Sequence, residues 1–130
     1  MELTLAQPRR AGRRLAYGML ALTLVAVIGF EVVEHATGYW QLAAFGLGPD
    51  LALLLGAGGR LARGQLHPRA VPLYNALHRF WGPLSLLTVA LVVGLPLGYV
   101  VGALAWAFHV ALDRSLGYGL RTPDGIQRSQ

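Results

Sequence analysis

The chain has 130 residues, of which 55% are hydrophobic and 13% are charged, and its mean hydropathy is +0.49. This composition excludes a disordered chain and argues against an ordinary water-soluble domain. The formal net charge of +5 comes from 11 arginines set against six acidic residues. Because the arginines fall in short clusters between long apolar runs, as in membrane proteins, no nucleic-acid partner is expected. Cysteine is absent, which excludes disulfides, thiol catalysis and thiolate metal sites.

The first apolar run predicts a transmembrane helix at about residues 15–35, preceded by a basic segment at 1–14. A cleaved signal peptide is the alternative, because Arg13 and Arg14 resemble a twin-arginine signal. Against cleavage, the small residues at 36–38 follow two glutamates and a histidine, which makes a poor cleavage site. The sequence leaves open whether this segment is processed.

The remaining apolar stretches predict three more spans. The second lies at about 39–58 and contains a proline and an aspartate at its centre. The next uncharged stretch has 29 residues, from Phe80 to Phe108, and as one helix it would be roughly 43 Å long, more than a hydrocarbon core of about 30 Å. Glycines around Pro96 predict a turn inside it. We therefore expect spans at about 70–93 and 96–114, followed by a short tail at 115–130.

Four spans put the N-terminus, the middle loop and the C-terminus on one side of the membrane. Ten of the 11 arginines then lie on that side, and the two opposite turns carry none. By the positive-inside rule both termini are cytoplasmic. The sequence thus predicts an all-α polytopic membrane protein, in which 1–130 form one membrane domain, an antiparallel bundle of four transmembrane helices.

Polar residues inside these spans are unexpected, because each ionisable group costs about 2.5–3.5 kcal/mol on insertion. The alternating topology places Asp50, His78 and His109 at similar depth in the cytoplasmic half. His109 and Asp113 are four residues apart and share one helix face, as do Tyr74 and His78. The same half of the bundle also contains Asn75 and Arg79.

Several interpretations of this cluster stay open. One is a network of buried ion pairs, in which Asp113 orients His109 and Asp50 neutralises Arg79. Another is a zinc-like divalent metal held by His78, His109, Asp113 and Asp50, which would suit a membrane-embedded hydrolase acting on a lipid-like substrate. A third is axial ligation of a haem-like tetrapyrrole by His78 and His109.

Two further interpretations need no metal. The cluster could relay protons or pass a solute, or the protein could be a non-enzymatic accessory or scaffold subunit of a larger membrane complex, or a homo-oligomer. Whether the protein is an enzyme is left open. The expected partners are the lipid bilayer and these membrane proteins.

Three stretches of the chain resemble the conserved motifs of one protein family. They are GPDLALL at 48–54, YNALHRFWGPL at 74–84 and AFHVALDRSLGYGLRTPDG at 107–125. They are similar to an uncharacterised domain-of-unknown-function family of small bacterial four-helix integral membrane proteins. The likeness covers about the last two thirds of the chain, and its closing motif is specific. It implies a multi-pass protein of the bacterial inner membrane and assigns no reaction. The family's characteristic positions correspond to Asp50, Asn75, His78, His109, Asp113, Arg114, Gly117, Tyr118 and Gly119.

Overall fold

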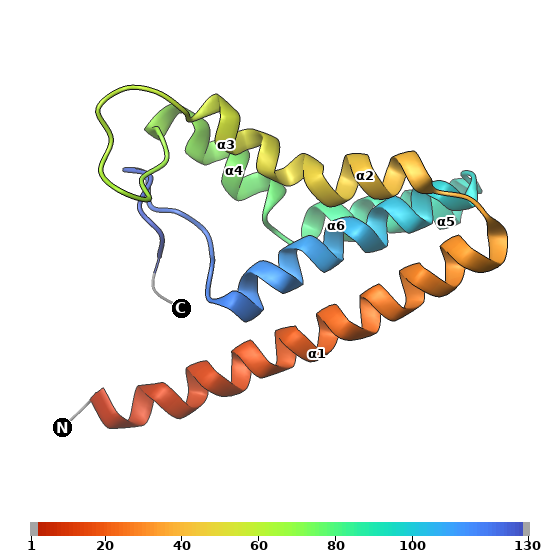
Figure 1. Ribbon diagram of the computed structural model, residues 1–130, viewed down its shortest axis with the longest axis horizontal. Helices are drawn as coiled ribbons and strands as arrows, with labels where there is room; N and C mark the ends of the chain where they lie inside the picture. The colour runs from red at the N-terminus through yellow and green to blue at the C-terminus, as the bar shows by residue number, and fades with distance from the viewer. Residues whose placement is uncertain (1–2, 129–130) are drawn as a thin grey trace.

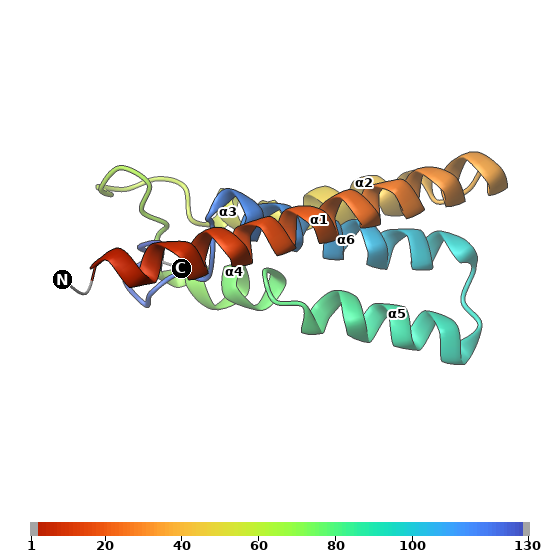
Figure 2. The same ribbon diagram turned by 90° about the horizontal axis from the view of Figure 1, so that it is seen from below.

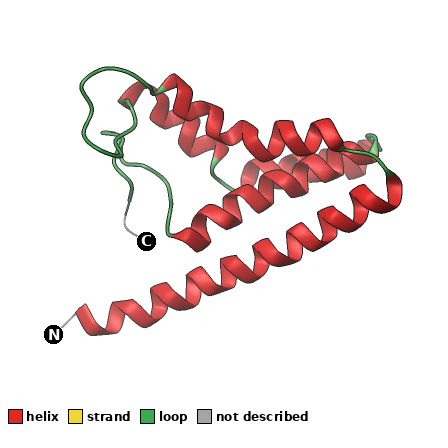
Figure 3. Cartoon of the chain, in the orientation of Figure 1, coloured by secondary structure: helices red, strands yellow, loops and turns green. Residues whose placement is uncertain are grey.

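The protein is helical throughout the residues that the computed structural model describes, 3–128, apart from its loops and tail (Figures 1 and 3). The helices, with the 3-10 turns η1 and η2, are α1 (Leu3–His35), α2 (Tyr39–Leu47), η1 (Gly48–Asp50), α3 (Leu51–Leu55), η2 (Pro68–Ala70), α4 (Val71–Leu77), α5 (Trp81–Val93) and α6 (Leu97–Leu116). The described tail after α6 contains one isolated β-bridge, between Arg121 and Gln127.

The helix ends agree with the predicted turns. α1 ends at His35, and Gly38 before α2 has φ 86°, a left-handed conformation that a side chain would disfavour. Gly94 ends α5 in the same conformation, with φ 73°. One boundary differs from the prediction, because the basic segment is not separate. Within the described residues, 3–14 continue α1 as one helix, and only Pro8 interrupts its hydrogen-bond pattern.

The segments run alternately in opposite directions, so α1, the α2–α3 pair, the α4–α5 pair and α6 form an antiparallel arrangement (Figures 1 and 2). The start of α1, the loop between α3 and η2, and the C-terminal tail lie at one end of the molecule. α6 contacts α1, α2 and α5, and is therefore the central helix.

Small residues let α6 pack closely against α2, as the spacing of Gly98 and Gly102 predicts. A Cβ atom added at Gly102 would lie 2.6 Å from Cδ2 of Phe45, and Gly98 lies directly against the side chain of Gln41. Close approach of this kind is how helices associate where water provides no driving force.

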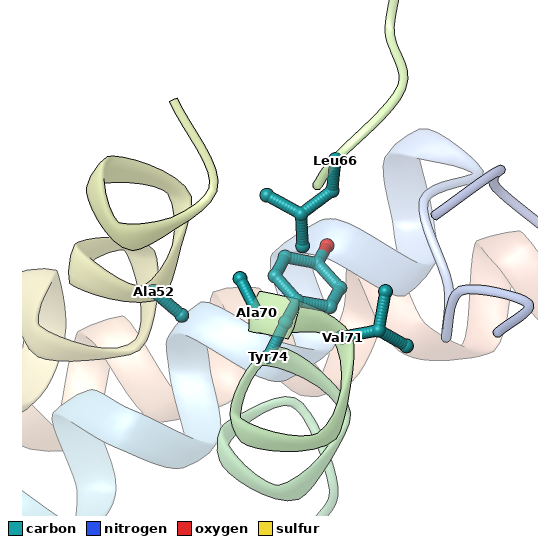
Figure 4. Packing of buried hydrophobic residues seen from close by; sticks show 5 residues of the cluster. All are labelled: Ala52, Leu66, Ala70, Val71 and Tyr74. Atoms are coloured by element: carbon teal, nitrogen blue, oxygen red, sulfur yellow. The ribbon is translucent and has the colours of Figure 1, made fainter. Parts of the chain in front are cut away.

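Two apolar clusters hold the remaining elements together. Ile28, Val101 and Ala105 join α1 to α6. At the other end Tyr74 of α4 lies among Ala52 of α3, Ala70, Val71 and the loop residue Leu66 (Figure 4). This second cluster ties α3 and α4 together beside the polar residues described below.

The structure differs from the prediction of four separate spans. By length and composition, one described helix segment, Pro8–His35, is long and apolar enough to cross a membrane, and a second qualifies if Pro68–Leu77 and Trp81–Val93 are taken as one span bent by 44°. The others fall short for physical reasons. Pro49 divides the second helix into α2 and α3, and α6 carries a histidine and an Asp-Arg pair in its last third.

Replacing Gly102 tests the contact between α6 and α2. Gly102→Ala should destabilise the protein by about 1–3 kcal/mol, because the added methyl overlaps Phe45. The control is Gly29→Ala on α1, where nothing lies within 4 Å of the added carbon. Because alanine favours the helix over glycine, this variant should be more stable by up to about 1 kcal/mol. Chemical unfolding of both variants in detergent measures the difference. Equal stabilities would contradict the close packing.

Candidate functional site

The α2–α3 pair and the α4–α5 pair are each interrupted at the depth where the polar residues meet. The first break follows α2, where Pro49 lacks an N–H and the chain forms η1 before α3 begins. Asp50 is the last residue of this 3-10 turn. The second break lies between α4 and α5, where His78 terminates α4 and Arg79 and Phe80 precede α5 (Figure 2).

α6 supplies donors for the carbonyl groups that these breaks release. Trp106 Nε1 donates to the Leu77 carbonyl at 2.7 Å, and Arg114 Nη2 donates to the His78 carbonyl at 2.8 Å. Unpaired carbonyls at a helix end are costly when buried, so these bonds stabilise the interruption in place. The broken helix is thereby fixed to α6 on both sides of His78.

The breaks bring four side chains together: Asp50, His78, His109 and Asp113. His78 Nε2 lies 3.4 Å from an oxygen of each carboxylate. His109 Nε2 lies 3.3 Å from the same Asp50 oxygen and 3.6 Å from the Asp113 oxygen. The two Nε2 atoms are 3.3 Å apart. One ligand atom from each residue thus converges on a common centre.

Five of the six separations between the ligand atoms are close to those of tetrahedral coordination. Four ligands held at about 2.0–2.1 Å from a zinc ion are separated by about 3.3–3.4 Å. Five of the six separations here are 3.3–3.6 Å, and the sixth, between the carboxylate oxygens, is within 4.8 Å. Two imidazoles and two carboxylates are also a donor set that zinc accepts.

Hydrogen bonds on the far side of each ring orient the imidazoles. His78 Nδ1 lies 2.8 Å from the Tyr74 carbonyl, and His109 Nδ1 lies 2.8 Å from the Gly46 carbonyl. A carbonyl only accepts, so both Nδ1 atoms carry the proton and donate it. In the neutral imidazoles both Nε2 atoms therefore present lone pairs to the centre. Such support is typical of metal-binding histidines.

The exposure of the four side chains is uneven. The side chain of His78 is 2% exposed and that of His109 is 11% exposed, whereas the side chain of Asp50 is 51% exposed. The group therefore has a closed side, formed by α4 and α6, and an open side at Asp50.

The C-terminal tail supports His78 indirectly, through Tyr74. The Tyr74 ring stacks on the His78 imidazole with a centroid distance of 3.9 Å, and the Arg121 guanidinium lies 4.9 Å above the same phenol ring. Asn75 holds the tail in place, because its amide donates to the Arg121 carbonyl and accepts from the Arg121 N–H.

The structure places the other predicted site residues around the cluster rather than in it. Asn75 bonds the tail, and Arg114 bonds the carbonyl of His78 and, at 3.5 Å, that of Tyr118. Arg79 is exposed and forms no ion pair among the described residues, so the expected Asp50–Arg79 pair is wrong. The physical reason is that Arg79 lies in the break between α4 and α5, so it does not occupy the position on a continuous helix that the prediction assumed.

Sequence reasoning missed Trp106 and Arg121, which hold the cluster from outside. Trp106 lies three residues before His109, on a shared face of α6, and this spacing could have indicated its role. Arg121 belongs to the tail, whose position no periodicity specifies.

The geometry argues against the haem-like alternative. Two axial imidazoles on one iron would hold their Nε2 atoms about 4 Å apart on opposite faces of a macrocycle. Here these atoms are 3.3 Å apart, with both carboxylates beside them, and no plane is left for a porphyrin.

Comparison with known families matches the profile described as Domain of unknown function (DUF4260) to residues 14–130, and the chain belongs to this family. The match begins well before the motif at 48–54, so it extends beyond the last two thirds of the chain that the three motifs indicated. The family description assigns no activity. No curated protein and no solved structure matches the chain.

Proposed function

We propose that this protein is an integral membrane protein that binds one zinc-like divalent cation through Asp50, His78, His109 and Asp113. The observation that carries the proposal is the set of five ligand separations of 3.3–3.6 Å. They correspond to the edges of one coordination tetrahedron.

A network of ion pairs explains the same cluster less well. With both Nδ1 protons donated to carbonyls, the centre contains two nitrogen lone pairs and two carboxylate oxygens, which are all acceptors. Acceptors repel one another at these distances unless a cation or added protons lie among them. A single divalent ion satisfies all four groups at once.

The surface of the protein supports placement in a membrane. The chain exposes 8464 Å², whereas a compact soluble protein of 14.0 kDa exposes about 6,700 Å². In the most apolar stretch of α1, only 11% of the residues are buried inside the protein. The core helix of a soluble protein is mostly buried. α5 likewise exposes Leu91, Val92 and Val93. Lipid would cover this surface without the cost of exposing it to water.

The position of the arginines favours the four-pass topology, with both termini in the cytoplasm of a bacterial cell. The start of α1, the middle loop and the tail share one end of the molecule and contain eight of the 11 arginines. Two more are next to these segments in the chain, Arg69 in η2 and Arg114 in the last turn of α6. The two broken helix pairs would each cross once, because non-helical backbone within a bilayer is tolerated where it is buried in protein or lines a cavity.

Metal binding is tested by purifying the protein in detergent, adding limiting Zn²⁺ and measuring metal content after gel filtration. We expect one zinc per chain in the wild type and less than about a tenth of that in His109→Gln, because second-sphere changes alone cost 10–100-fold in affinity and this change removes a ligand. His35→Gln at the far end of α1 is the control and should retain full zinc. Full occupancy in His109→Gln, or none in the wild type, would sink the proposal.

The exposure of Asp50 favours hydrolysis of a lipid-like substrate as a second candidate function. Three less exposed ligands, His78, His109 and Asp113, would hold the cation, and the exposed Asp50 could exchange with substrate or accept a proton from water. When bound, the cation would act as a Lewis acid on a carbonyl or phosphoryl oxygen. The open side would admit an amphiphile from the bilayer.

Asp50→Asn tests this second function. Because His78, His109 and Asp113 still hold the ion, the variant should retain its zinc when Zn²⁺ is supplied in excess. It should lose about 10²–10⁴-fold in turnover, because the amide accepts no proton from water. Release of fatty acid or phosphate from mixed phospholipid micelles measures the rate, and Asp124→Asn in the tail is the control. If zinc-loaded wild type releases neither product, or if Asp50→Asn is as fast, the protein is not such a hydrolase.

The topology makes a separate prediction. Alkaline phosphatase fused after Gln130 should be inactive and green fluorescent protein fused there should be fluorescent, because the C-terminus is cytoplasmic. Fusions in the turn between α5 and α6 should give the reverse result. An active phosphatase after Gln130 contradicts the four-pass arrangement.

A further inference from the structure

A basic pocket lies between the first turns of α1 and the end of α6, away from the metal cluster. It has a volume of about 180 Å³ and is lined by Arg10, Arg13, Arg14 and Gly117. Gly117 ends α6 with φ 92°, and its missing side chain leaves space beside the Arg14 guanidinium.

Only one of the three guanidinium groups is used within the fold. Arg14 Nε donates to the Ser115 carbonyl at 2.9 Å, which fixes this side chain at the end of α6. Arg10 and Arg13 are exposed and make no hydrogen bond or ion pair among the described side chains. Three converging positive charges repel one another, and an anion between them removes this cost. Planar guanidinium groups bind phosphate with paired hydrogen bonds.

A separate apolar groove lies further along α1. Tyr17, one turn beyond Arg13 and Arg14, stacks on Phe80 with a centroid distance of 6.0 Å. Beyond this pair lies a groove of about 230 Å³ without polar lining. Its walls include Leu20 and Leu24 of α1, Phe80, Leu84 of α5, and Leu104 and Ala107 of α6.

The two features are spaced as the two parts of a lipid. Leu20 and Leu24 follow Arg13 by seven and 11 residues, so they lie roughly 10–16 Å further along the helix. This is the distance from a phospholipid phosphate into the upper and middle part of its acyl chains. A soluble phosphate would use the pocket and leave the groove empty.

We propose that Arg10, Arg13 and Arg14 bind the phosphate of an anionic phospholipid of the cytoplasmic leaflet, and that one acyl chain of the lipid occupies the groove between α1, α5 and α6. The site does not require the metal centre. It rests on the proposed membrane placement only for the source of the lipid.

The experiment is a lipid titration of the full chain in a neutral detergent, followed by native mass spectrometry and thermal unfolding. The probes are phosphatidylglycerol, phosphatidylcholine with the same acyl chains, and glycerol phosphate. We expect phosphatidylglycerol to bind and raise the unfolding temperature, and the other two to bind at least tenfold more weakly.

Variants then distinguish a specific lipid-binding site from a general attraction of the anionic lipid to positive charge. Arg10→Gln with Arg13→Gln should weaken phosphatidylglycerol binding about 30-fold, since each arginine near a membrane surface contributes about fivefold. The matched control is Arg60→Gln with Arg63→Gln, which removes the same charge from the middle loop and should change binding less than about threefold. Equal losses in the two double variants would overturn the proposal.

Leu20→Asn tests the groove without changing charge. It should weaken phosphatidylglycerol binding and leave the weaker binding of glycerol phosphate as it was. If phosphatidylglycerol binds this folded variant as tightly as the wild type, or if glycerol phosphate binds the wild type as tightly as the lipid does, the groove holds no acyl chain and the proposal fails. Circular dichroism establishes that each variant is folded.

Discussion

The structure depends on the bonds by which α6 holds two interrupted helices. Trp106, His109 and Arg114 each donate a hydrogen bond to a carbonyl beside a break, at Leu77, Gly46 and His78. Without these donors the carbonyl groups would be unpaired in an apolar setting, and the chain would favour continuous helices. Continuous helices would point Asp50 and His78 elsewhere, so the breaks and the cluster exist together.

The packing of α6 follows from the same requirement. A helix that packs against three neighbours at once needs small side chains on at least one face, so that a neighbour can approach closely. Gly98, Gly102 and Ala105 form this face on the side of α2. The longer side chains, which carry the donors, lie in the half of the helix nearer the tail. α6 is thus divided into a packing half and a polar half, and the break carbonyls determine which residues the polar half needs.

Much of this could be predicted from the sequence. The apolar runs and their glycines located the helix ends, and the i to i+4 spacing placed His109 and Asp113 on one face. The 44° bend between α4 and α5 could not be predicted, because Pro83 is compatible with a straight helix start as well as with a break. Arg79 is exposed in this break, and the bend leaves fewer continuous apolar helices than the four expected. The tail contact between Asn75 and Arg121 joins residues 46 apart, which no local pattern specifies.

The origin of the four clustered side chains has a consequence for assembly. Asp50, His78 and the pair on α6 come from three segments, separated by 28 and 31 residues of chain. A cation bound to all of them closes two long loops at one point, as a covalent crosslink would, and the unfolded chain has no such preformed site. Loading with the proposed cation would then report that the α2–α3 pair and the α4–α5 pair had both docked on α6, so metal content would also measure completed folding.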